Sequence, residues 1–282
     1  MINIENLSYM YNKKDIILKD INLKIKDGEI ICIIGKNGSG KSTLLKLIAG
    51  IIKPSLGNVF IDNINILKRK ELRKEVGIVF QNPDSQILFP KVFDDIEFAL
   101  NNLKIENKNE RIKNALKDVN LSDKEQKDTY NLSLGQKQRV NIASVLAINP
   151  KYILLDEPTT MIDSIEKENI YQIIKQLKKD GKTIIFTTNN INEILLSDRI
   201  LILENKEIKH IIEKNKLLEN IQILQECDII IPDVIQIILK LNKNGKDISL
   251  KEWTISEMIN EIVKVCESWK MYLNYYFLSH IL

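Results

Sequence analysis

Residues Gly35–Ser42 combine three glycines with lysine and serine at a spacing that can bind phosphate. The segment reads GKNGSGKS and fits the pattern G-x-x-x-x-G-K-[ST]. The glycines let the backbone turn so that successive N–H groups point inward around an anion. We expect Lys41 to reach the β- and γ-phosphates of a bound nucleotide and the Ser42 hydroxyl to ligate Mg²⁺.

The neighbours of this segment predict the strand and the helix that phosphate binding requires. Residues Glu29–Gly35 form a short apolar run that ends at a glycine, as a buried strand does. The stretch Lys41–Ala49 places its apolar residues on one face, as a core-facing helix does, and its first turn adds the positive end of a helix dipole. The expected nucleotide contacts are Gly35, Lys36, Asn37, Gly38, Ser39, Gly40, Lys41, Ser42 and Thr43.

Two adjacent carboxylates end another apolar run, YILLDEP. Asp156 closes the expected strand, where it can hold the water shell of Mg²⁺. Glu157 follows it, in the place of a base that acts on the attacking water. A carboxylate pair that only caps a strand is the alternative, but a phosphate-binding segment in the same chain favours the catalytic interpretation.

Strands and helices alternate along most of the chain, which predicts an α/β fold with a mainly parallel sheet. Further strands are expected at Val76–Phe80, Tyr152–Glu157, Thr183–Thr188 and Arg199–Glu204, and helices at Arg111–Val119, Gly135–Ala147, Ser164–Lys179 and Ile191–Leu196. The alternation of apolar and polar residues in Ile2–Tyr11 and Ile16–Ile25 predicts antiparallel strands. After Glu213 the pattern changes to short helical stretches, at Lys214–Asn220, Pro232–Leu241 and about Ser256–Val265. These predict a small separate helical unit.

Length and composition narrow the class of protein. A chain of 282 residues can hold one large domain and a smaller appendage. Lys and Arg number 41 against 38 for Asp and Glu, a net charge of +3 that is too balanced for a nucleic-acid binder. The three cysteines lack metal-ligand spacing, and together with the absence of a secretory signal they favour the cytoplasm. No stretch reaches the length of a membrane-spanning helix, so a membrane role would come through a partner.

The segment LSLGQKQRV, Leu132–Val140, resembles the LSGGQ signature of ABC ATPases. Ser133, Gly135 and Gln136 match that signature, while Leu134 stands where the family has its first glycine. In that family the signature faces the γ-phosphate bound by another subunit. The resemblance therefore implies a dimer, either of this chain with itself or with a paralogue, that binds ATP and Mg²⁺ between its subunits.

Other positions match the family in order along residues 1 to about 212. Tyr11 resembles the aromatic residue that stacks on adenine, although a plain strand-end tyrosine is the alternative. Gln81 resembles the glutamine that contacts Mg²⁺ or water and couples to the membrane subunit, and Asp163 resembles the aspartate that crosses the dimer interface. The resemblance implies a phosphate-loop NTPase cassette in residues 1–213, with an antiparallel N-terminal β subdomain, a helical signature subdomain at about 82–150, and a small helical extension at 214–282.

Asn189 departs from the family, which has a switch histidine at this place. The only histidines are His210 and His280, and neither is near in sequence. Asparagine can donate a hydrogen bond to a γ-phosphate, but it cannot carry a positive charge or shuttle a proton. We therefore hypothesise that the site on this phosphate loop hydrolyses ATP slowly and that a paralogous partner supplies the faster site.

The segment FQNPDSQIL…VFDDIEFAL, Phe80–Leu100, resembles the ATPases of energy-coupling factor transporters, which take up vitamins and transition metals. The same group is resembled by the segments TTMID and QKQRV and by the C-terminal stretch from Ile229. The resemblance implies a place on the cytoplasmic face of the cell membrane, beneath a scaffold called the T component, with a separate S component that selects the substrate. A scaffold helix would dock near Gln81–Phe98, either on Phe89, Phe93 and Phe98 or on the bulge Asp84–Pro90; the alternative is that these aromatic residues fill the core.

Several alternatives stay open at this point. One alternative is the ATPase of a different ABC transporter, and another is a regulatory subunit that binds ATP but scarcely hydrolyses it. A third, a soluble ABC protein working on ribosomes or DNA, is disfavoured by the single cassette and the balanced charge. The aromatic tail Trp269–Leu282 reads as a helix on the appendage, with a dimer or membrane contact as the alternative. Nothing in the sequence names the transported substrate.

Overall fold

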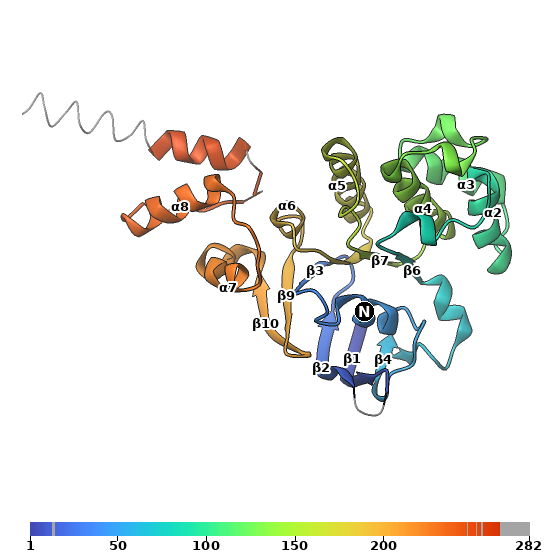
Figure 1. Cartoon of the computed structure of the whole chain (residues 1–282), viewed down its shortest axis with the longest axis horizontal. Coiled ribbons are helices and arrows are strands. Elements are labelled where there is room, and N and C mark those ends of the chain that lie inside the picture. Colours follow the sequence, from blue (N-terminus) through green and yellow to red (C-terminus); the bar gives the residue numbers. More distant parts are fainter. Residues whose placement is uncertain (13–14, 247, 252, 255, 266–282) are drawn as a thin grey trace, which may run out of the picture. The chain divides into compact units, whose positions relative to one another are not determined.

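The structure is a computed structural model that describes residues 1–12, 15–246, 248–251, 253–254 and 256–265 (Figure 1). The chain divides into two compact units, Met1–Ile212 and Glu213–Leu282. The expectation for the aromatic tail Trp269–Leu282 lies outside the described residues.

A six-stranded sheet forms the centre of the first unit, in the order β10-β9-β3-β8-β7-β6. Its strands are β3 (Ile30–Ile34), β6 (Val76–Val79), β7 (Tyr152–Asp156), β8 (Thr183–Thr187), β9 (Arg199–Glu204) and β10 (Glu207–Glu213). The pairs β3–β8, β3–β9, β6–β7 and β7–β8 are parallel. Every residue of β3, β7 and β8 is buried, as expected for parallel strands covered on both faces.

The register of the sheet brings the expected chemical groups to one edge. Asp156 at the end of β7 pairs with Thr187 at the end of β8, and Thr187 also pairs with Ile33 of β3. Parallel strands end on the same edge of a sheet, where open α/β sheets bind their ligands. The segments that follow β3, β7 and β8 therefore converge, and they carry the phosphate loop, Glu157 and Asn189.

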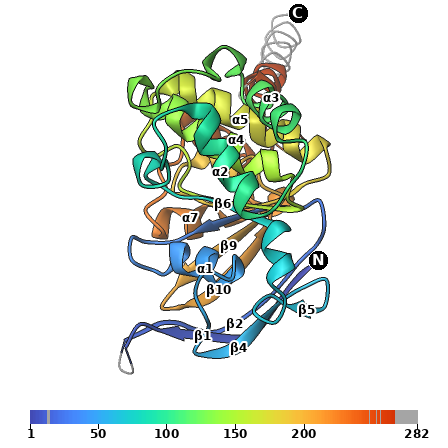
Figure 2. The ribbon, with the colours of Figure 1, turned by 90° about the vertical axis from the view of Figure 1, so that its right-hand side faces the viewer.

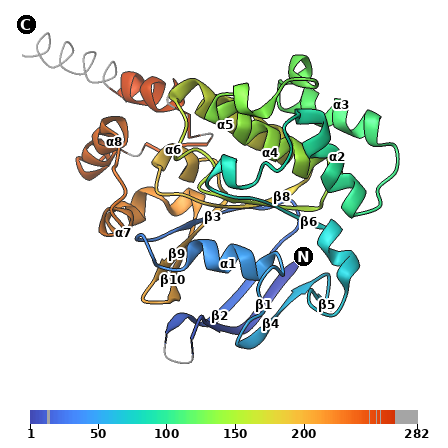
Figure 3. The same ribbon diagram turned by 45° about the vertical axis from the view of Figure 1, so that its right-hand side comes forward.

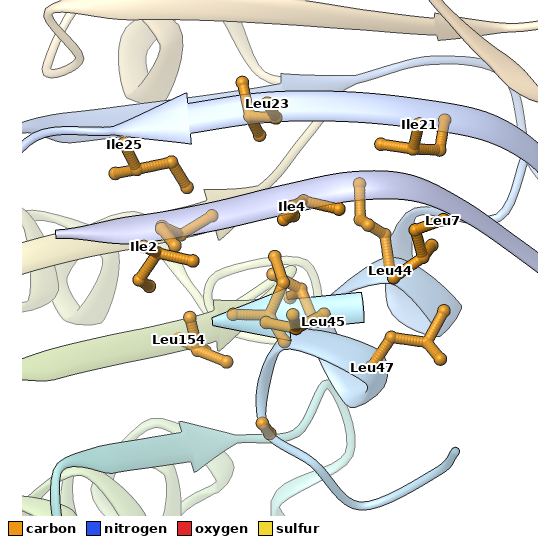
Figure 4. Packing of buried hydrophobic residues seen from close by; sticks show 14 of the residues in the cluster. Ile2, Ile4, Leu7, Ile21, Leu23, Ile25, Leu44, Leu45, Leu47 and Leu154 are labelled. Atoms are coloured by element: carbon orange, nitrogen blue, oxygen red, sulfur yellow. The ribbon is translucent and has the colours of Figure 1, made fainter. Parts of the chain in front are cut away.

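An antiparallel sheet in the order β2-β1-β4-β5 covers one side of this unit. Its strands are β1 (Ile2–Met10), β2 (Ile16–Ile25), β4 (Leu56–Ile61) and β5 (Ile64–Asn65). Helix α1 (Lys41–Ile48) lies between this sheet and the central one (Figure 2). Leu44, Leu45 and Leu47 of α1 pack with Ile2, Ile4 and Leu154 in one apolar core (Figure 4). This packing fixes the helix that begins at the end of the phosphate loop.

Helices cover the other side of the central sheet (Figure 3). They are α2 (Val92–Asn102), α3 (Lys108–Asp118), α4 (Leu134–Ile148), α5 (Ser164–Lys179) and α6 (Ile191–Ile194). Short 3₁₀ turns lie between the main elements at η1 (Lys70–Lys74), η2 (Pro83–Ser85), η3 (Ser122–Lys124) and η4 (Thr129–Asn131). Helices α2 and α3 both pack against α4, so the region between β6 and β7 is a helical group built around α4.

The second unit is helical in its described part. It contains the turns η5 (Lys214–Lys216) and η6 (Leu218–Asn220), the helices α7 (Ile221–Glu226) and α8 (Asp233–Lys243), and a helix at residues 256–265. Two short turns replace the single helix expected at Lys214–Asn220, where Leu217 is the one fully buried side chain. Among the described residues of the whole chain, no helix is long and apolar enough to span a bilayer.

The expected fold class is confirmed, because a mainly parallel sheet, an antiparallel N-terminal sheet and a helical group are all present. The element boundaries differ by a few residues. Helix α2, which we did not predict as a helix, begins directly after the bulge at Asp84–Pro90. Its first turn carries Asp94 and Asp95, which suit the positive end of a helix dipole.

Candidate nucleotide-binding site

A cavity of about 550 Å³ opens at the sheet edge where the chemical groups converge. Its lining consists of Tyr11, Ile17, Asn37, Gly38, Ser39, Gly40, Lys41, Ser42, Thr43, Gln81, Glu157 and Thr160. Separate parts of the chain thus surround one space: the phosphate loop and the start of α1, the segments after β6 and β7, and Tyr11 and Ile17 of the N-terminal strand region. The size is suited to a small-molecule ligand.

Two glycines of the loop are required by their surroundings. A Cβ atom on Gly35 would lie 2.3 Å from the carbonyl oxygen of Leu203, so no side chain fits where the loop leaves β3. Gly40 has a φ of 105°, in the left-handed region, and is the residue before α1 begins. A Cβ atom there would lie 2.9 Å from Leu18 Cδ2. Backbone geometry therefore explains these glycines without reference to a ligand.

Lys41 lies under the loop with its amine directed at backbone oxygens. Its side chain is 5% exposed, and Nζ donates to the Gly35 carbonyl over 2.7 Å. The Glu157 carboxylate lies 3.8 Å away through Oε1. Burial lowers the pKa of Lys41, while Glu157 and Asp156 oppose that shift. The arrangement holds a cation at the floor of the cavity, where a phosphate would be attracted.

Ser42, Asp156 and Thr187 form a chain of hydrogen bonds next to the loop. Ser42 Oγ donates to Asp156 Oδ1 over 3.0 Å, and Thr187 Oγ1 donates to the same oxygen over 2.7 Å. Thr187 is fully buried and fixes the carboxylate from within the sheet. The hydroxyl and the carboxylate are hard oxygen ligands of the kind that Mg²⁺ prefers, so this pair fits that ion.

Glu157 is held by three other groups. Gln81 Nε2 donates to its Oε2 over 2.7 Å, and Thr160 Oγ1 donates to the same oxygen over 3.2 Å. Its backbone N–H donates to Thr187 Oγ1 over 2.9 Å. The backbone of Glu157 has a φ of 44°, a left-handed conformation that is uncommon outside glycine and is found at functional sites. This carboxylate is therefore set in one orientation at the cavity wall.

Asn189 contacts the start of the phosphate loop. With its amide oriented to satisfy both neighbours, the nitrogen donates to the Gly35 carbonyl over 3.2 Å and to the Thr188 carbonyl over 2.9 Å. Gly35 O also accepts from Lys41, so both side chains meet at one backbone oxygen. Asn189 is exposed and does not line the cavity, but it lies at the edge of the phosphate loop.

Tyr11 borders the cavity just beyond the end of β1. Its side chain is 58% exposed, and its hydroxyl lies 3.5 Å from Thr43 Oγ1. The ring meets Tyr9 edge to face, with centroids 5.0 Å apart. The exposed face of the ring is compatible with stacking on a flat ligand.

The signature residues and Asp163 do not line this cavity. Ser133 caps α4 by accepting from the N–H of Gln136 over 3.2 Å, and the Gln136 side chain accepts from the Ser133 N–H over 3.2 Å. Asp163 caps α5 in the same way, accepting from the N–H of Ile165 over 2.9 Å. A Cβ atom on Gly135 would lie 2.3 Å from Glu166 Cγ, so the starts of the two helices pack closely.

Polar side chains of α4 hold the segment around Gln81. Asn141, fully buried, donates to the Pro83 carbonyl over 3.1 Å, and Gln138 donates to the Phe80 carbonyl over 3.4 Å. Lys137 adds an ion pair with Asp84 at 2.8 Å. The helix that begins with the signature is thus joined to the backbone on both sides of Gln81.

Some residues of the site were not predicted from the sequence. Thr160 and Ile17 line the cavity, and Thr187 holds both Asp156 and the backbone of Glu157. The signal for Thr187 was present, because it ends an apolar strand directly before the expected switch position. No periodicity marks Thr160 or Ile17.

The aromatic residues expected in a docking groove pack partly against each other. The rings of Phe89 and Phe98 have centroids 4.9 Å apart, and both are half-buried. Leu88, in the bulge, is 66% exposed. A second cavity, of about 370 Å³, is lined by Ala49, Gly50, Ile51, Val76 and Ile78.

Comparisons with known proteins identify the family of the chain. Residues 18–160 match the ABC transporter family. The energy-coupling factor transporter ATP-binding protein EcfA1 of Fusobacterium nucleatum is 40% identical over 264 residues, which cover 92% of this chain and 97% of that protein. The EcfA1 protein of Oenococcus oeni is 37% identical over 270 residues, which cover 94% of this chain and 98% of that protein.

Solved structures give the same assignment. CbiO1 of Clostridium perfringens, part of the ABC transporter complex CbiONQ, is 34% identical and superposes with a TM-score of 0.72 over 84% of this chain and 98% of that one. A bacterial ABC transporter cassette solved as a dimer is 35% identical, with a TM-score of 0.69 over 76% of this chain and 99% of that one. The chain belongs to the ABC transporter family, within the group of energy-coupling factor transporter ATP-binding proteins.

Proposed function

We propose that this ATPase powers the import of a vitamin or a transition-metal ion, as half of a head-to-tail ATPase dimer. One observation carries the proposal: a single cavity joins the phosphate loop, Gln81 and Glu157, in a chain that matches energy-coupling factor ATP-binding proteins along most of its length. We assign residues 1–213 to the ATP-binding domain, with a helical subdomain at about 82–150, and residues 214–282 to a helical extension.

In this proposal the chain holds ATP by its phosphates. The backbone N–H groups of Gly35–Thr43 and the Lys41 amine bind the β- and γ-phosphates, and Tyr11 stacks on adenine. Lys41 leaves the Gly35 carbonyl, 2.7 Å from its amine here, to reach the γ-phosphate. Asn189, at the same carbonyl, then donates its amide hydrogen to a γ-phosphate oxygen.

Glu157 takes the proton of the attacking water. Gln81 and Thr160 donate to its Oε2, so Oε1, 3.8 Å from Lys41 Nζ, is the oxygen that faces the water. Fixing the carboxylate before the reaction avoids a cost of orientation in the transition state. Ser42, Asp156 and Gln81 would hold Mg²⁺, which when bound neutralises charge on the phosphate oxygens.

A second ATPase subunit, either a paralogue or another copy of this chain, completes each site. Ser133, Gly135 and Gln136 would contact the nucleotide held by that subunit, and Asp163 would cross the interface. The supporting observation is an exposed apolar group beside the starts of α4 and α5; its members are Leu134 at 38%, Met161 at 48% and Ile165 at 77% exposure. Apolar residues gathered in this way favour burial against another surface.

The remaining partners are integral membrane proteins at the cytoplasmic face of the cell membrane. A T-component scaffold would dock a helix on the apolar cavity formed by Ala49–Ile51, Val76 and Ile78, with the exposed Leu88 at the bulge, and an S component would bind the substrate. The apolar cavity differs from the aromatic groove of Phe89, Phe93 and Phe98 expected from the sequence. A net charge of +3 gives no support for a nucleic-acid partner.

Steady-state ATPase activity of the full chain, of Asn189→His and of Lys41→Ala tests the proposal. We expect Lys41→Ala to be inactive. If Asn189 limits the rate, the histidine variant gains up to about a hundredfold, the size of one catalytic hydrogen-bonding group. That outcome favours a low-activity subunit paired with a catalytic paralogue. An active wild type that histidine scarcely changes favours a homodimer, and activity independent of Lys41 contradicts the assigned site.

A further inference from the structure

A buried carboxyl group, Glu193 of α6, has no part in the scheme above. Its side chain is 1% exposed and does not line the nucleotide cavity. Burial raises the pKa of this carboxyl, and the hydroxyls of Thr159, Thr188 and Tyr171 oppose that shift. A buried carboxyl is unfavourable unless it is hydrogen-bonded, and an apolar side chain would fill the same volume without that penalty. The hydrogen bond that Glu193 Oε1 accepts therefore explains a glutamate here better than its volume does.

The first partner of Glu193 lies in the loop that follows Glu157. Thr159 is 2% exposed, and its hydroxyl donates to Glu193 Oε1. The next residue, Thr160, donates its own hydroxyl to Glu157 Oε2 over 3.2 Å. Glu193 thus holds a residue directly beside one of the groups that orient the proposed general base.

The second contact lies in the loop that carries Asn189, where the Glu193 backbone N–H donates to the Asn190 carbonyl over 3.1 Å. Thr188 is 3% exposed, and its hydroxyl accepts from the backbone N–H of Asn190 over 3.0 Å. The next residue, Asn189, reaches the Gly35 carbonyl at 3.2 Å. Glu193 is therefore joined, through Asn190, to the loop that carries the proposed γ-phosphate donor.

We propose, on the basis of the roles proposed above for Glu157 and Asn189, that Glu193 is a positioning residue that fixes the loop after β7 against the loop after β8. It acts through its side-chain bond to Thr159 and its backbone bond to Asn190, and touches neither the nucleotide nor the water. Its contribution therefore falls on the rate of hydrolysis and not on ATP binding.

The two loops need such a link because they are separate in sequence and carry groups that must act together. A displacement of about 1 Å, caused by a change away from the reacting atoms, can lower a rate by about a hundredfold. The phosphate loop does not depend on this link, since its conformation is fixed by Gly35, by Gly40 and by the packing of α1. Binding and turnover are thus expected to respond differently.

Five variants of the full chain test this role. Glu193→Ala and Thr159→Val remove one side of the hydrogen bond each, while Glu193→Gln and Thr159→Ser keep an acceptor and a hydroxyl in place. Ser197→Ala is the matched control: its hydroxyl is fully buried and donates to the Ile194 carbonyl over 2.7 Å, at the far end of α6. It removes a buried hydrogen bond just beyond the end of α6 without affecting either loop.

Two measurements are made on each variant, ATPase kinetics and amide hydrogen exchange. We expect Glu193→Ala and Thr159→Val to lower kcat about tenfold to a hundredfold, with the ATP dissociation constant changed less than about threefold. Glu193→Gln, Thr159→Ser and Ser197→Ala should keep kcat within about threefold of wild type. Amides of residues 157–163 and 187–190 should exchange faster in the first two variants and as in wild type in the last three.

The outcomes separate this role from plain structural support. The proposal is overturned if Glu193→Ala and Ser197→Ala lower kcat equally. It is also overturned if ATP affinity falls by as large a factor as kcat. Unchanged exchange in both loops also overturns it, and that measurement needs no hydrolysis. If the wild type shows no Lys41-dependent turnover, the proposed site roles fail, while the exchange result still decides whether Glu193 joins the loops. Should Glu193→Ala not fold, Thr159→Val against Thr159→Ser gives the same test.

Discussion

The wall of the nucleotide cavity and the helix starts of α4 and α5 use polar side chains in different ways. In the cavity wall, side chains from separate strands hold one another, as Gln81 holds Glu157 and Thr187 holds Asp156. At the helix starts, Ser133 and Asp163 instead cap their own helices. Polar groups there are satisfied within a few residues, and the apolar group Leu134, Met161 and Ile165 is exposed.

This difference separates what one chain can do from what needs a second surface. The cavity wall is fixed by the sheet register and requires no partner to bring its groups together. The helix starts offer N–H groups and exposed apolar side chains, which gain contacts only when another molecule covers them. Under the proposed function, ATP binding is accordingly expected of the single chain, and hydrolysis is expected to depend on the surface that covers α4 and α5.

The largest effect is expected from Glu157→Gln, which tests whether the cavity wall performs the chemistry. The amide keeps the size of the side chain but cannot take a proton from water, so the ATPase rate should fall about 10²- to 10⁴-fold. ATP affinity should change little, because Lys41 and the loop are retained. Equilibrium binding of a fluorescent ATP analogue and steady-state turnover measure the two quantities. A rate within threefold of wild type would show that Glu157 is not the base.

A smaller effect is expected from Asn141→Ala, which tests the contact between α4 and the segment around Gln81. The variant leaves the buried Pro83 carbonyl without the donor that now lies 3.1 Å away, a loss of about 1–3 kcal/mol in the free energy of unfolding. Urea unfolding measures it.

Ser144→Ala is the control on the same helix. The Ser144 hydroxyl is buried and has no hydrogen-bond partner among the described residues, so its removal should leave stability almost unchanged. Equal losses of unfolding free energy in the two variants would mean that the lost side-chain volume, and not the lost hydrogen bond to Pro83, lowers the stability.

The sequence predicted the cavity wall better than the contacts around it. The phosphate loop, Asp156 and Glu157 follow apolar strands, and parallel strands bring their ends to one edge, so pattern and topology together imply that they meet. Glu193 and Asn141 are different, because each forms a hydrogen bond to a residue far away in the chain. Neither spacing nor periodicity encodes such pairs. Helix α2 was missed although it buries Val92, Ile96 and Leu100 at helical spacing, so the pattern for this helix was present in the sequence.

The smallest effect is expected at Tyr11, where the cavity wall is least fixed by the chain itself. The ring is 58% exposed and its hydroxyl has only a long contact, 3.5 Å, with Thr43. If the ring stacks on adenine, Tyr11→Ala should weaken ATP binding about tenfold, and Tyr11→Phe should stay within about twofold, because stacking needs the ring and not the hydroxyl. Titration with ATP and with GTP by calorimetry measures this. Equal affinity of all three proteins would make Tyr11 a strand-end residue packed on Tyr9, and the adenine contact would have to come from elsewhere on the wall.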